Sequence, residues 1–183
     1  IATGEVGKNP AIHLYVYDNT TRHFESLCTM KGFHTKGVVQ LSFSNTGKTI
    51  FTVGADYTIA VYNTDINNEG DFGHMITSAR GPKGKVLHCC SLIPYHKDEG
   101  DFLSCGEKHI TYWINNDKSK KLEMKEVKLG SFKRDYAMCC ARLRDANTAV
   151  VGTSQGDILY IQSATLMGSN CGEGKVNSSK KLH

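Results

Sequence analysis

The sequence predicts an all-β fold built from about four copies of one four-stranded unit. Three observations support it. No stretch of eleven or more residues keeps the i, i+3, i+4, i+7 apolar spacing of a helix. Each copy has a small-residue turn that contains a glycine, at Gly4, Gly54, Gly106 and Gly152. A strand follows each turn, and these strands end near Tyr17, Tyr62, Trp113 and Ile161, at intervals of 45, 51 and 48 residues.

These intervals are close to the roughly 40–45 residues of one blade in a WD40-type β-propeller, with slightly long loops. A single unit cannot bury its own faces, so the copies must stack on one another. Propellers close with about four to eight blades. We therefore expect three and a half to four blades of a larger ring in residues 1–165, and a loop or linker to the next blade in residues 166–183.

The strands of each copy are indicated in order by apolar and polar alternation and by turn residues. The innermost strands are predicted at 38–43, 86–92 and 136–143. In the second copy, an Asn-Thr-Gly-Lys turn leads to strands at 50–53 and 58–63. Further strands are predicted at 102–105, 109–114, 122–127, 148–153 and 158–162.

Four residues of the second copy occupy the places where WD40 blades set His, Ser or Thr, Asp and Trp. They are His34, Thr52, Asp56 and Tyr62. A buried Asp56 requires donors, because an unpaired buried carboxylate is very costly. We expect those donors to be the imidazole of His34, the hydroxyl of Thr52 and the hydroxyl of Tyr62. A structural hydrogen-bond network of this kind is favoured over a His-Asp pair for acid–base catalysis. The other copies lack the full set.

The sequence contains IATG at 1–4, YD at 17–18, KGFH at 31–34, CGEKHITYW at 105–113 and VGTSQGDILYI at 151–161. Together these motifs resemble the echinoderm microtubule-associated protein-like (EML) family. The resemblance covers about residues 1–165 and implies a tandem propeller that binds tubulin and associates with microtubules. Tyr17, Tyr62 and Ile161 replace tryptophan at three strand ends, and the resemblance assigns no tubulin-binding residues.

Composition is ordinary, with 39% hydrophobic and 22% charged residues and a net charge of +4. The longest apolar runs are too short to span a bilayer. The seven cysteines form no CxxC motif, and the neighbours Cys89-Cys90 and Cys139-Cys140 suit neither a zinc site nor a disulfide framework. One of each pair is expected to pack inside, because neighbours on a strand point to opposite faces.

The sequence thus predicts a non-enzymatic scaffold that binds tubulin through propeller surfaces, located in the cytoplasm and cytoskeleton or in a cilium or flagellum. We expect no catalytic residue, metal or cofactor, and neither a nucleic-acid nor a membrane partner. Two alternatives stay open. One is a ciliary or generic WD40 scaffold that does not bind tubulin. The other is an enzyme, which would need a nucleophile, a base and an orienting group that converge in a pocket.

Overall fold

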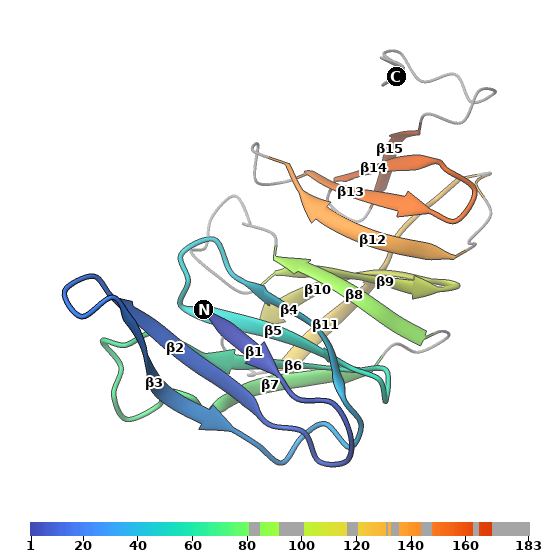
Figure 1. Cartoon of the computed structure of the whole chain (residues 1–183). Helices are drawn as coiled ribbons and strands as arrows, with labels where there is room; N and C mark the ends of the chain where they lie inside the picture. Colours follow the sequence, from blue (N-terminus) through green and yellow to red (C-terminus); the bar gives the residue numbers. More distant parts are fainter. Residues whose placement is uncertain are drawn as a thin grey trace.

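The computed structural model describes residues 1–80, 85–91, 101–116, 121–130, 132, 136–143, 148–162 and 165–169. The described residues form antiparallel β-sheets that stack along the chain, without a helix (Figure 1). This architecture confirms the all-β prediction. None of these residues belongs to a helix that is long and apolar enough to cross a membrane.

The first sheet has three strands and the other three have four each, and within each sheet every strand pairs with the next one along the chain. The first sheet contains β1 (Ala2–Gly4), β2 (Ile12–Asp18) and β3 (His23–Met30), and the second contains β4 (Val38–Phe43), β5 (Thr49–Gly54), β6 (Thr58–Asn63) and β7 (Met75–Arg80). The third contains β8 (Lys85–Ser91), β9 (Phe102–Glu107), β10 (His109–Asn116) and β11 (Lys121–Glu126), and the fourth contains β12 (Ala137–Arg142), β13 (Thr148–Thr153), β14 (Ile158–Gln162) and β15 (Thr165–Ser169).

The inner edge of the stack is formed by β4, β8 and β12, which contact one another in that order. These are the strands that the sequence predicts to be innermost, with ends that differ by one residue at most. The fourth sheet continues through β15 to Ser169, past residue 165, and residues 170–183 lie outside the described residues.

Each inner strand carries a bulge at the same place. The register with the second strand of the sheet shifts between Val38 and Gln40, between Val86 and His88, and between Ala137 and Cys139. A bulge leaves one residue unpaired in the ladder and increases the local twist. The three sheets therefore repeat one another in detail, with Val39, Leu87 and Met138 at the bulged position.

The core lies between the sheets, in three apolar clusters. The first joins the first and second sheets and contains Ile12, Leu14, Met30, Val38, Ile50, Ala60 and Tyr62. The second joins the second and third sheets and contains Phe51, Val53, Ile59, Val61, Val86, Phe102 and Trp113. The third joins the third and fourth sheets and contains Leu103, Cys105, Ile110, Val127, Leu129, Ala137, Ala149, Val151, Leu159 and Ile161. Burial of apolar area at about 25 cal/mol per Å² makes this stacking the main stabilising term.

The exposure of the aromatic side chains near the strand ends depends on whether a neighbouring sheet covers them. Tyr62 in β6 and Trp113 in β10 are 3% and 5% exposed, because each packs on the preceding sheet. Tyr17, near the end of β2, lies on the face of the first sheet away from the second, because Ile12 and Leu14 face the second sheet, and it is 44% exposed. Its ring contacts Phe24, with centroids 5.1 Å apart.

The turn glycines do not all share one position, which corrects the alignment expected from sequence. Gly54 and Gly106 pair with Val38 and Val86 at the start of the bulge, but Thr153 takes that place in the fourth sheet. Gly152 lies one residue earlier and therefore faces the opposite side of its sheet. Gly4 differs from Gly54 as well. A Cβ at Gly4 would lie 2.6 Å from the Val38 side chain, so this position faces the second sheet.

The different burial of Tyr17 and Tyr62 can be tested by truncating both side chains. Tyr62→Ala should lower the free energy of unfolding by about 3–5 kcal/mol, since it removes a buried aromatic side chain and leaves a cavity. Tyr17→Ala should change it by about 0.5 kcal/mol or less, as expected for an exposed position. Urea denaturation of both variants provides the comparison. Equal losses would contradict the difference in burial between the two tyrosines.

Candidate functional site

The polar cluster of the second blade is centred on His34, which lies in the loop between β3 and β4. Its Nε2 is 2.7 Å from Oγ1 of Thr52 in β5, and its Nδ1 is 3.0 Å from Oγ1 of Thr58 at the start of β6. The Thr52 hydroxyl also lies 3.4 Å from the carbonyl oxygen of Ala60. Both His34 and Thr52 are buried. The imidazole therefore joins the incoming loop to the two middle strands of the sheet.

Asp56 receives its hydrogen bonds from two threonines. Thr35 donates its backbone N–H at 2.8 Å and its hydroxyl at 3.0 Å to Oδ2, and Thr58 donates its hydroxyl at 2.6 Å to Oδ1. The Nδ1 of His34 is 3.5 Å from Oδ1. Arg80, at the end of β7, reaches the backbone carbonyl of Asp56 with its guanidinium, at 3.4 Å. The carboxylate thus connects the loop before β4, the turn after β5 and the start of β6.

The protonation states follow from this geometry. Because the Thr58 hydroxyl donates to Asp56, its oxygen can accept from the Nδ1–H of His34, which leaves Nε2 to accept from the Thr52 hydroxyl. Burial lowers the pKa of the His34 imidazole, although Asp56 acts in the opposite direction. Burial alone would raise the pKa of the Asp56 carboxyl, but the hydrogen bonds from Thr58 and Thr35 outweigh it and lower the pKa from 3.8 to about 2. At neutral pH the pair is a neutral imidazole beside a carboxylate.

Gly54 is required by this cluster rather than by its backbone angles. A Cβ at this position would lie 2.5 Å from Nδ1 of His34 and closer still to Oδ1 of Asp56. Real Cβ atoms essentially never approach other heavy atoms this closely. The space that a side chain would fill at the end of β5 is therefore occupied by the His34 and Asp56 groups.

Two of the three partners expected for Asp56 make other contacts than predicted. Thr52 contacts His34 rather than Asp56, and Tyr62 packs in the apolar cluster against the first sheet. Among the described hydrogen bonds, none joins Tyr62 to His34, Thr52 or Asp56. The phenol hydroxyl lies at the far end of its ring and does not reproduce the indole N–H that it was expected to replace. Burial raises the pKa of Tyr62.

A second polar cluster, which sequence reasoning missed, lies in the third blade. Trp113 donates its indole N–H to Oγ of Ser104 at 2.7 Å, and Oγ of Ser104 is 2.5 Å from Nε2 of His109. Ser104 occupies the position of Thr52, as the pairing of both with the inner strand shows. The sequence could have indicated this cluster, because Ser104 precedes Gly106 by two residues just as Thr52 precedes Gly54. His109 comes from the third strand rather than from the preceding loop.

Neither cluster offers groups to a substrate. His34 is buried, and both its ring nitrogens and the Asp56 oxygens are engaged within the sheet. Acid–base catalysis needs a proton donor or acceptor within reach of a bound reactant. The geometry therefore favours the structural interpretation. In the described part of the chain, no group of three or more His, Cys, Asp or Glu residues could hold a metal ion.

The described cysteines are free thiols. Cys140 packs against the third apolar cluster, whereas its neighbour Cys139 is exposed. The expectation that one of this pair packs inside is met. The side chains of Cys89 and Cys90 lie outside the described residues.

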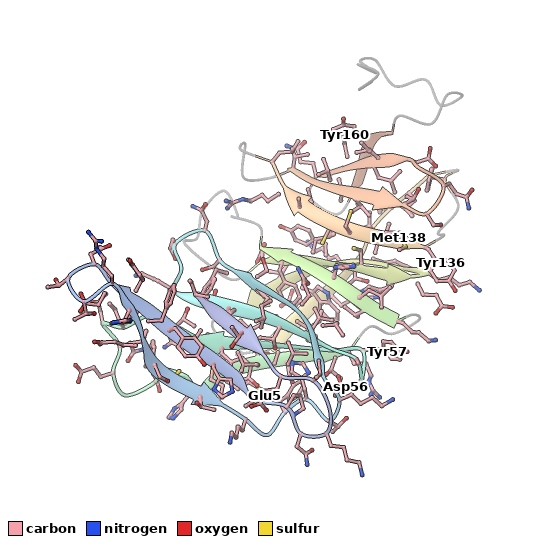
Figure 2. All side chains as sticks on the ribbon, viewed as in Figure 1. Glu5, Asp56, Tyr57, Tyr136, Met138 and Tyr160 are labelled. Atoms are coloured by element: carbon pink, nitrogen blue, oxygen red, sulfur yellow. The ribbon has the colours of Figure 1, made fainter. Side chains whose placement is uncertain are left out.

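The end of the stack that carries these turns also holds contacts between blades. The ammonium of Lys85 lies 5.3 Å from the ring centroid of Tyr57 in the preceding blade and 3.3 Å from a carboxylate oxygen of Glu107. Glu107 forms a β-bridge with Tyr136 of the following blade. Figure 2 shows Glu5, Asp56, Tyr57, Tyr136 and Met138 along one side of the stacked sheets.

Comparison with known proteins agrees with this fold. The structure is similar to the β-propeller domain of Cps50 (Swd1) from Myceliophteria thermophila, with a TM-score of 0.68 and 14% sequence identity. The similarity covers 97% of this chain and 52% of that one, so the chain spans about half the length of that domain. No family model matches the sequence. The chain therefore has the fold of a WD40-type β-propeller, and the EML resemblance depends on its quoted motifs alone.

The contribution of the carboxylate can be measured with Asp56→Ala. We expect a loss of about 1–3 kcal/mol in the free energy of unfolding, because the Thr35 and Thr58 donors lose a charged acceptor. Asp71→Ala, at an exposed position, is the matched control. Equal midpoints in urea for the two variants would contradict a structural role for Asp56.

The stability of the fold should also depend on pH through Asp56. A carboxyl whose pKa is lowered on folding contributes stability above its unfolded value, and the contribution is lost as the pH falls through the folded value. The free energy of unfolding should therefore fall between about pH 4 and pH 2. Asp56→Asn should lack this component. A parallel pH profile for the two proteins would refute the assignment.

Proposed function

We propose that this chain is a non-enzymatic protein-binding scaffold and that its partner is tubulin in microtubules. The propeller fold carries the first part of this proposal, because a stack of blades offers broad rigid surfaces on which loops can hold a partner. The polar cluster around His34 supports it, since that cluster is used internally to hold the blade together.

Tubulin as the partner is supported by the EML-like motifs at 1–4, 17–18, 31–34, 105–113 and 151–161. The net charge of +4 is compatible with an acidic partner surface. Exposed cations gather near the turns of the second and third blades, at Lys36, Arg80 and Lys108. The proposed location is the cytoplasm and cytoskeleton, including cilia or flagella.

The alternative is a WD40 scaffold that binds another protein. The similarity to the Swd1 propeller domain supports it equally, because at 14% identity that similarity shows the fold alone. The two functions differ in one observable, which is affinity for polymerised tubulin.

Co-sedimentation with microtubules tests the proposal. We expect the chain to pellet with microtubules at low salt and to remain in the supernatant at high salt, because exposed charges are screened beyond about 8 Å near physiological ionic strength. Lys36→Glu should weaken pelleting. Lys48→Glu is the control, since Lys48 already lies 3.4 Å from Asp65. Absence of pelleting at low salt would exclude tubulin and favour the alternative scaffold.

A further inference from the structure

We draw no further inference here: the strongest candidate, the aromatic face of the first sheet on which the paired side chains of Tyr17 and Phe24 are 44% and 55% exposed, faces away from the other described sheets, and nothing in the structure shows what covers it.

Discussion

The structure depends on one constraint, which is that each sheet has two apolar faces and can cover neither by itself. In β5, Phe51 and Val53 face the third sheet, whereas Ile50 faces the first. The same alternation places Phe102 against the second sheet and Leu103 against the fourth. The sheets must therefore stack in chain order (Figure 1), and the exposed Tyr17 marks the face of the first sheet that has no neighbour among the described residues.

The polar clusters provide hydrogen-bond partners for the hydroxyl groups that this stacking buries. Thr52 lies between apolar residues on a buried face, so its hydroxyl needs partners. His34 provides one and thereby fastens the incoming loop to the sheet. In the third blade Ser104 takes this place and meets His109 and Trp113 instead. The fourth blade has Val151, which is fully buried and needs no partner. The position is constrained by burial, whereas its polar partners differ from blade to blade.

This difference explains how much could be predicted from the sequence. Strand positions follow from alternation and turns, which are local, and the inner strands were found to within one residue. His34, Thr52 and Asp56 were chosen because they occupy the places of His, Ser or Thr, and Asp in WD40 blades, and their structural role followed from the cost of burying polar groups. The roles of Thr35 and Thr58 did not, because they depend on how the loop before β4 meets the turn after β5, and no local pattern encodes that approach. The glycine alignment failed because a shift of one residue along a strand exchanges its two faces.

The exposed apolar residues differ in whether a neighbouring sheet is described beside them. Tyr17 is exposed on a face that neighbouring sheets cover in the second and third blades, so its exposure belongs to the stacking. Val39 lies on β4, in a sheet with a described neighbour on both faces, and it is still 53% exposed. Met138 lies on β12, in the last of the described sheets, which has a described neighbour on one face. Apolar side chains that remain open when stacking is satisfied are the positions at which a partner would gain most from burial. The buried His34 cluster holds its blade together, so recognition of a partner is to be sought on the exposed surfaces of the blades.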